Sequence, residues 1–183
     1  ITMAYDNWGM TANDAIGMII RGQQQGMDIA GDMMDTFLEY TPIFGQMGVK
    51  GEDAFNLINS AMKTTGMDSD KVADMMKELT LTITDGSDTS ADALKSVGMD
   101  VKDLTSRIDS GKITMSDAFK EVSTAILNVE DETTRATALQ DIFKGTVEYG
   151  NQSVLESWVG VQNETLNTSN AIDEVKTAYE NSY

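Results

Sequence analysis

The sequence predicts an all-α fold, a compact multi-helix domain of short amphipathic helices. Apolar residues recur at helical spacing along most of the chain. The chain contains a single proline, and runs with the alternation of a β-strand are scarce. Glycines cut the helical stretches at irregular intervals, so we expect several short helices rather than one long rod.

A recurring unit marks the breaks between the expected helices. It consists of a glycine, an apolar residue and a polar residue, as in Gly9-Met10-Thr11, Gly48-Val49-Lys50, Gly66-Met67-Asp68 and Gly98-Met99-Asp100. The glycine can adopt the left-handed conformation that ends a helix, and the apolar residue can fold back on that end. The polar residue can then cap the next helix. Because the spacing of the units is irregular, we interpret them as helix punctuation and not as the period of a repeat protein.

Residues 1–84 are predicted to form an N-terminal helical half. Its expected helices run from Thr11 to Gly22, from Ile29 to Tyr40, from Ala54 to Thr65 and from Asp70 to Thr84. Thr41-Pro42 predicts a cap followed by proline at the first position of a separate short helical turn. Leu79 to Thr84 alternates apolar residues with threonine in the manner of a strand, but no second strand is available nearby, so a helix is favoured.

Residues 85–162 are predicted to form a C-terminal helical half, separated from the first by the loop signal Asp85-Gly86-Ser87-Asp88. The expected helices are Ala91–Val97, Val101–Asp109, Met115–Val129, Glu132–Phe143 and a stretch after Gly150. We expect residues 1–162 to pack as one compact domain. The sequence starts at Ile1 and not at methionine, so we expect it to be a piece of a longer chain. Residues 163–183 are then interpreted as a polar helical tail or a linker to the rest of that chain.

Composition restricts the function. Thirty acidic and 13 basic residues give a net charge of −17, so nucleic acid and anionic lipid should be repelled. No apolar run reaches the roughly 18 residues of a membrane span. The absence of cysteine and histidine excludes disulfides, Cys- or His-based metal sites and His-dependent catalytic triads. No cofactor is predicted.

Two places in the sequence could carry chemistry. Asp85, Ser87, Thr89 and Asp92 offer oxygens at short spacing, but the calcium-binding EF-hand frame fails because its sixth position holds Ser90 instead of glycine. A turn that caps the next helix is the favoured interpretation. Glu39 lies between two apolar residues, where burial could make it a general acid. The favoured alternative places it at the end of an exposed face.

Aromatic and asparagine residues suggest further sites. Trp8 and Trp158 could anchor a protein interface, although packing in the core is the favoured interpretation. Asn151, Asn163 and Asn167 each start an Asn-x-Ser/Thr frame, which carries little weight in a chain rich in these residues. No catalytic, cofactor-binding or metal-binding residue is predicted.

Several short stretches carry a family resemblance through their order. They are Glu39-Tyr40-Thr41-Pro42-Ile43-Phe44-Gly45-Gln46-Met47-Gly48 with Glu52-Asp53-Ala54-Phe55-Asn56-Leu57, then Asp70-Lys71-Val72-Ala73-Asp74, Asp85-Gly86-Ser87-Asp88, Ala93-Leu94-Lys95-Ser96-Val97-Gly98-Met99-Asp100 and Ala118-Phe119-Lys120-Glu121-Val122. Over residues 10–150 the chain thereby resembles tail tape measure proteins of long-tailed bacteriophages and prophages. One departure is the extra lysine in Ile142-Phe143-Lys144-Gly145-Thr146, where the family tends to read aliphatic-Phe-Gly-Thr.

The resemblance implies a structural role and no enzymatic activity. Proteins of this family set tail length, template polymerisation of the tail tube and leave the tube when DNA is ejected. It implies as partners other copies of the protein, the tail tube protein and tail assembly chaperones. The implied location is the virion tail, inside the tube, with the host cytoplasm during assembly. The alternatives are a peptidoglycan hydrolase that uses Glu39 or another buried carboxylate, and a helical adaptor unrelated to phage.

Overall fold

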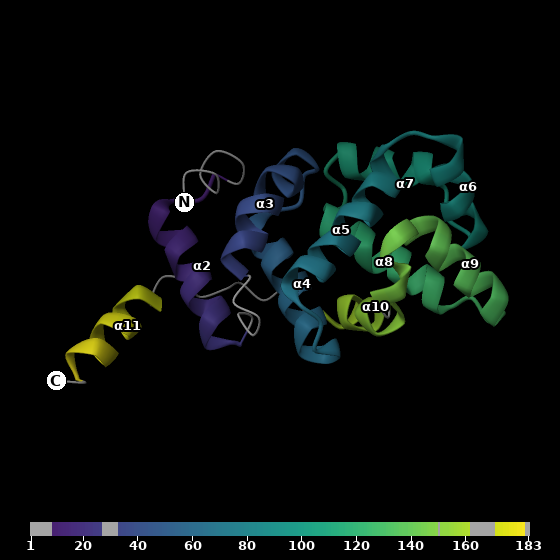
Figure 1. Cartoon of the computed structure of the whole chain (residues 1–183). Coiled ribbons are helices and arrows are strands. Elements are labelled where there is room, and N and C mark those ends of the chain that lie inside the picture. Colours follow the sequence, from purple (N-terminus) through teal and green to yellow (C-terminus); the bar gives the residue numbers. More distant parts are fainter. Residues whose placement is uncertain (1–8, 27–32, 150, 162–170, 182–183) are drawn as a thin grey trace.

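A computed structural model describes residues 9–26, 33–149, 151–161 and 171–181. Within these ranges the chain is helical and contains no strand, which confirms the all-α prediction. The helices are α2 (Ala12–Gln24), α3 (Met33–Gln46), α4 (Gly51–Thr65), α5 (Ser69–Thr84), α6 (Asp88–Ser96), α7 (Val101–Asp109), α8 (Met115–Leu127), α9 (Glu132–Phe143), the 3₁₀ helix η1 (Lys144–Tyr149), α10 (Asn151–Gly160) and α11 (Ala171–Glu180) (Figure 1). None of the described helices is long and apolar enough to cross a bilayer.

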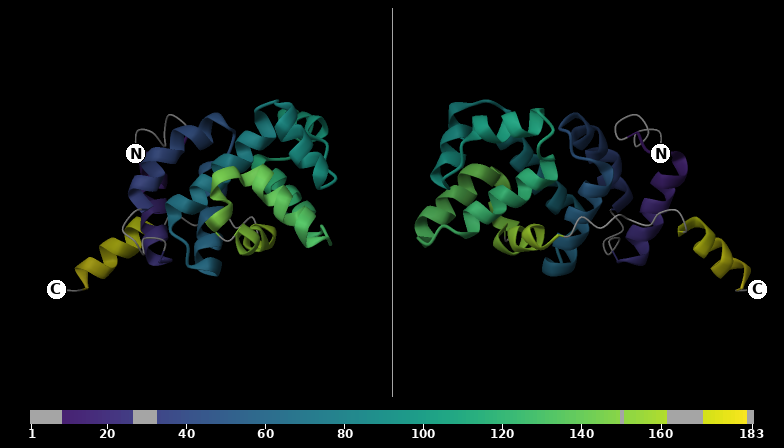
Figure 2. Two further views of the ribbon diagram at one scale, coloured as in Figure 1. Left: turned by 45° about the vertical axis from the view of Figure 1, so that its right-hand side comes forward. Right: turned by 180° about the vertical axis from the view of Figure 1, so that it is seen from behind.

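The helices form an elongated body with α2 and α11 at one end and α6, α7 and α9 at the other (Figures 1 and 2). In the middle, α10 packs against both α4 and α8, and α5 packs against α3, α4 and α9. At the end of the body, α11 packs against α2, and its C-terminal part projects away from the other helices. Helices from both sides of the Asp85 loop therefore share one body.

The core is made of the apolar faces that the helical spacing predicts. The largest fully buried side chains include Trp158, Phe44, Phe55, Phe119 and Phe143. Burial of side chains this large is the main favourable contribution to folding. Polar contacts inside the body join distant parts of the chain: the Thr82 hydroxyl donates to the Ile142 carbonyl at 2.9 Å, and the Ser60 hydroxyl to the Ser157 carbonyl at 3.2 Å.

The predicted break units are confirmed in their glycine and apolar positions. Gly66 and Gly98 adopt φ angles of 71° and 80°, a left-handed conformation that costs residues with a Cβ atom more than glycine. The apolar residues that follow them, Met67 and Met99, pack against the core. The Asp100 carboxylate then caps α7 by accepting from the Lys102 and Asp103 amides.

The capping prediction fails at two of the break units. Lys50 and Asp68 precede α4 and α5 in an extended conformation, but neither side chain makes a capping hydrogen bond. Lys50 has no acceptor atom in its side chain, and the Asp68 carboxylate instead pairs with Lys71 Nζ at 3.2 Å. At the starts of α2 and α8, Thr11 and Thr114 form full capping boxes with the aspartates three residues later.

The prediction of a separate helical turn beginning at Pro42 is wrong. Pro42 lies inside α3, which runs without interruption to Gln46. Proline removes the amide that would bond to the Leu38 carbonyl, and Leu38 lies on the exposed side of the helix, where water can satisfy that carbonyl. Thr41 is not a cap, because its hydroxyl donates back to the Phe37 carbonyl.

Other boundaries follow local caps. α6 starts at Asp88, earlier than predicted, because Ser87 Oγ accepts from the Ser90 amide at 3.1 Å. The threonine-rich stretch Leu79–Thr84 continues α5, as predicted. Two of its hydroxyls are satisfied within the helix, since Thr80 donates to the Met76 carbonyl and Thr84 to the Thr80 carbonyl, and the third, Thr82, donates to Ile142 of α9.

Candidate protein-contact surfaces

The structure places Trp158 in the core and not on a surface. Its side chain is fully buried, and Nε1 donates to the Leu57 carbonyl at 3.2 Å. Its ring stacks on Phe119 at a centroid distance of 5.6 Å and lies 6.3 Å from the Phe143 ring. The core interpretation of Trp158 is therefore confirmed, and α10 holds this ring between α4 and α8. Trp8 lies outside the described residues.

Glu39 is exposed on α3, so the burial that would make it a general acid is absent and its placement on an exposed face is confirmed. Its buried neighbour is Tyr40, whose hydroxyl donates to Asp74 Oδ1 at 2.6 Å. Burial raises the pKa of Tyr40 strongly, and the Asp74 hydrogen bond and the nearby charges of Asp74, Glu39 and Asp70 raise it further. The tyrosine hydroxyl therefore serves as a hydrogen-bond donor between α3 and α5.

The Asp85 loop acts as a cap, as predicted. Asp85 accepts from the Ser87 amide at 2.9 Å and from the Ser90 hydroxyl at 2.7 Å. Loss of water acts to raise the pKa of Asp85, but these hydrogen bonds outweigh it and the pKa is lowered. Across the ranges that the structure describes, no three acidic side chains are grouped so that they could hold a metal ion.

Two carboxylates that sequence reasoning did not pair come close enough to interact. Asp53 and Asp117 are the aspartates of the two Asp-Ala-Phe stretches, in the first turns of α4 and α8. Burial raises the pKa of Asp53; Lys50 and Lys120 act to lower it, and Asp117 to raise it. The Thr114 amide, at 2.9 Å, lowers the pKa of Asp117. The sequence repeats Asp-Ala-Phe at both positions, but the repetition alone does not predict that the two aspartates come close.

Opposed pKa shifts in neighbouring carboxylates are found in acid–base catalysis, but helix capping accounts for Asp117. Its carboxylate accepts from both the Thr114 amide and the Thr114 hydroxyl, the latter at 2.8 Å. Asp53 is only half-buried. The two carboxylates therefore lie near the starts of two helices as like charges that Lys50 and Lys120 partly compensate.

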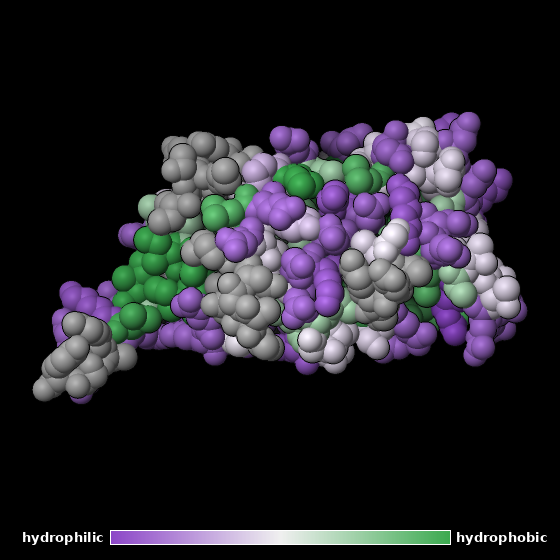
Figure 3. Space-filling model, in the orientation of Figure 1, coloured by the Kyte–Doolittle hydropathy of each residue, from purple (hydrophilic) through white to green (hydrophobic). Residues whose placement is uncertain are grey.

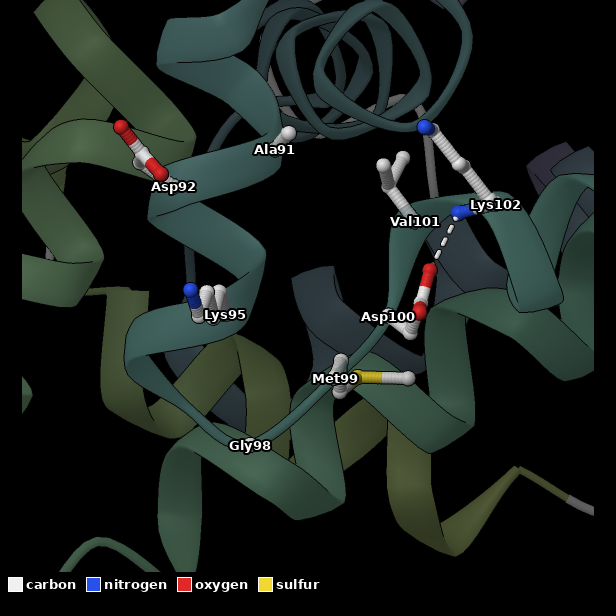
Figure 4. Close-up of a pocket in the computed structure, with 8 residues that line it drawn as sticks. All are labelled: Ala91, Asp92, Lys95, Gly98, Met99, Asp100, Val101 and Lys102. Carbon is white, nitrogen blue, oxygen red and sulfur yellow. Dashed lines mark hydrogen bonds between the residues drawn. The ribbon is translucent and has the colours of Figure 1, made fainter.

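A depression of about 510 Å³ lies between α6 and the start of α7 (Figure 4). It is lined by Ala91, Asp92, Lys95, Gly98, Met99, Asp100, Val101 and Lys102. The Asp100 carboxylate is turned toward the Lys102 amide, to which it is hydrogen-bonded at 2.8 Å. The lining combines acidic and basic side chains with the thioether of Met99. Such a surface suits contact with another protein better than catalysis.

The second surface lies at the opposite end of the body. Figure 3 shows apolar surface gathered over α2 and the adjoining start of α11. The apolar side chains of these helices that keep some exposure include Ile16, Ile19, Ile20, Ile172 and Val175. Arg21 of α2 forms a two-bond ion pair with Glu174 of α11, at 2.7 and 2.9 Å. Contiguous apolar surface of this kind is typical of interaction sites.

The fold and these surfaces define a helical protein suited to contacts with other proteins. The model of the family described as phage-related minor tail protein matches residues 1–144, so the chain belongs to this family and is a phage tail protein. No curated protein matches the chain, and no solved structure does.

Family membership excludes one of the functions that the sequence left open. The adaptor unrelated to phage is wrong, because the family is a phage tail family with a structural role. The matched region ends at Lys144, the extra lysine noted in the sequence. Lys144 has a φ angle of 50°, a conformation in which glycine is favoured over residues with a Cβ atom. The extra lysine, at which this chain departs from the tape measure pattern, therefore lies where α9 ends and η1 begins.

Proposed function

We propose that this chain is an assembly module of a tail tape measure protein, which takes part in tail length determination and tail tube assembly through protein contacts. The order of the motifs and the family membership support this proposal. The module acts inside the tail tube of the virion and in the host cytoplasm during assembly. Its partners are other copies of the protein, the tail tube protein and tail assembly chaperones.

The observation that carries the proposal is the folding of the helices onto one another. At about 1.5 Å per residue, a continuous helix of this chain would span roughly 275 Å, whereas a compact domain of this size has a radius of gyration of about 16 Å. The hydrogen bond from Trp158 to Leu57 joins residues 101 positions apart, and stretching the chain would break it. We infer that this part of the protein works as a folded module and not as the extended ruler.

The acidic surface is consistent with a place in a tube that conducts DNA. With a net charge of −17, the module repels the phosphate backbone instead of gathering it. We therefore propose that it does not bind nucleic acid. Retention of duplex DNA by the purified chain at physiological salt would contradict this part of the proposal.

Tail length in the phage that encodes the protein tests the proposal. In-frame removal of residues 9–161 should abolish assembly of tails and not merely shorten them. If the segment were an extended ruler, its removal would give complete tails shorter by roughly 230 Å, at about 1.5 Å per residue. Trp158→Ala keeps the number of residues and disrupts the core, so it should cause the same assembly defect. The matched control is Val159→Ala, which alters a side chain that is 42% exposed.

Peptidoglycan hydrolysis is the second candidate, and the opposed pKa shifts of Asp53 and Asp117 are the observation that favours it. We propose that the chain is not an enzyme, because Asp117 is engaged in a cap. Incubation of the chain with purified cell walls should leave their turbidity unchanged. A loss of turbidity that disappears in Asp53→Asn but persists in Glu39→Gln would reverse this ranking.

A further inference from the structure

The two sides of α2 have different neighbours. Ala15 and Gly22 are buried on the side that faces the body, and Met18 beside them belongs to the core. At 3.6 residues per turn, Gly17 and Gln24 lie on the opposite side of the helix. Gly17 is nevertheless buried, and Gln24 hydrogen-bonds to Glu174 of α11. This outer side of α2 is therefore the surface that α11 covers.

The contact between α11 and α2 is chemically specific. Two parallel hydrogen bonds join the Arg21 guanidinium to the Glu174 carboxylate, with Nη1–Oε2 at 2.7 Å and Nη2–Oε1 at 2.9 Å. Such bidentate pairs fix orientation as well as contributing energy. Ala171 is fully buried, whereas Val175, one turn later, is 45% exposed. The contact thus holds the first turns of α11, and the remainder projects from the body (Figures 1 and 2).

We propose that copies of this chain join by exchanging α11, so that the α11 helix of one copy occupies the outer side of α2 in another. Arg21 and Glu174 are 153 positions apart, and every contact between them can form equally well between two chains. Exchange of an identical element is a low-cost route to a dimer because no new contact has to be created. Burial of Ala171 at the start of α11 favours occupation of this surface over leaving it bare.

Charge favours an exchanged helix over direct contact between bodies. Two copies each carry a net charge of −17, so broad face-to-face contact would bring like charges together. The ten peptide steps from Val161 to Ala171 can span about 30 Å when extended, which lets α11 reach a second copy while the bodies stay apart. Arg21, the base within α2, is the group that the incoming Glu174 neutralises.

Exchange of α11 would be the contact between copies that the proposed function includes. Only its biological role rests on that function. Its experiment measures association of the purified chain, so it can fail while the tail assembly test succeeds.

Paired charge reversal tests the exchange. R21E alone and E174R alone each place like charges at the contact within one chain, so each variant should remain monomeric at all concentrations. When the two variants are mixed, reciprocal exchange places opposite charges at both contacts. Light scattering coupled to size-exclusion chromatography should then show a heterodimer of twice the monomer mass. The wild-type chain should shift from monomer to dimer as its concentration rises.

The double variant R21E/E174R restores opposite charges within one chain and should behave as wild type. Circular dichroism of all variants checks that the helical body is retained, which is expected because the ion pair lies at its edge. A wild-type chain or a variant mixture that stays monomeric would overturn the proposal. Dimers that persist in R21E alone would also overturn it, since they would use another surface.

Discussion

Two helices carry the same three residues near their starts and use them differently. Asp53-Ala54-Phe55 begins at the third residue of α4, and Asp117-Ala118-Phe119 at the third residue of α8. In both copies the alanine and the phenylalanine are fully buried. Phe55 stacks on Phe37 at a centroid distance of 6.3 Å, and Phe119 stacks on Trp158 at 5.6 Å. The apolar part of the motif therefore has one role in both places, to fix the helix against the core.

The aspartates of the two copies have opposite roles. Asp117 forms a capping box with Thr114, which lowers the pKa of Asp117. The residue three positions before Asp53 is Lys50, which has no acceptor to offer, and burial raises the pKa of Asp53. The residue three positions before the aspartate therefore decides whether its carboxylate stabilises the helix start or is a partly buried charge.

The largest expected effect tests the shared part of the motif. Phe119→Ala should lower the free energy of unfolding by about 3–5 kcal/mol, because it removes a fully buried ring and leaves a cavity. Phe55→Ala should cost a similar amount. Chemical denaturation monitored by circular dichroism measures both, and Leu38→Ala, at a side chain that is 46% exposed, is the control. A small loss in only one phenylalanine variant would show that the two helices are not equivalent in the core.

The next effect should have opposite signs in the two copies. Asp117→Asn should lower the free energy of unfolding at neutral pH by about 1 kcal/mol, because it removes the charge from a cap. Asp53→Asn should raise it by a few tenths of a kcal/mol, because it removes a partly buried charge. Equilibrium denaturation of both variants at pH 7 measures the difference. Two changes of the same sign would contradict the comparison.

The pH dependence of these two variants follows from the direction of each pKa shift. The pKa of Asp117 is lowered in the folded state, so its contribution is present above the ordinary value of about 4 and is lost as the pH falls through the folded-state pKa. The raised pKa of Asp53 means that the wild type loses its penalty as the pH falls through that value. Both variants should therefore approach wild-type stability in acid.

Sequence reasoning predicted α7 and α9 to the residue and missed the course of α3. The signals at α7 are local, a break at Gly98 and a cap at Asp100. At Pro42 the local signal was misleading, because the exposed side of α3 tolerates a missing hydrogen bond. Local rules describe the ends of helices well when the cap and the break both lie within a few residues.

Contacts between distant residues were beyond sequence reasoning. The hydrogen bond from Trp158 to Leu57 and the ion pair of Arg21 with Glu174 depend on how whole helices cross. Spacing predicts which face of a helix is buried, but not which helix covers it. The division of residues 1–162 from 163–183 stays a prediction, which limited proteolysis of the purified chain would test.

A gain of stability is expected where α4 lacks a cap. Lys50→Thr would place an acceptor three residues before Asp53 and so create the capping pattern found at Thr114. We expect the free energy of unfolding to rise by about 0.5–1 kcal/mol. Thermal unfolding measures the gain, and the control is Lys50→Ala, which removes the lysine without supplying an acceptor. An equal gain in Lys50→Ala would mean that removal of the lysine, and not the cap, is responsible.

The two copies also differ at the position six residues after each aspartate, which is Asn59 in α4 and Ser123 in α8. Both side chains are buried, and Asn59 Oδ1 and Ser123 Oγ have no hydrogen-bond partner among the described residues. Asn59 still donates through Nδ2 to Gln25, the residue that follows α2. Ser123→Ala should leave the free energy of unfolding unchanged or raise it by up to about 1 kcal/mol, since it removes a buried unpaired hydroxyl.

Asn59→Ala should instead lower the free energy of unfolding by about 1 kcal/mol, because it removes the hydrogen bond that ties α4 to Gln25 at the end of α2. The same denaturation experiment separates the two positions. A loss of stability in Ser123→Ala equal to that in Asn59→Ala would mean that the serine hydroxyl has a partner. The two copies of the motif would then be alike at this position too, and the difference between α4 and α8 would be confined to their first turns.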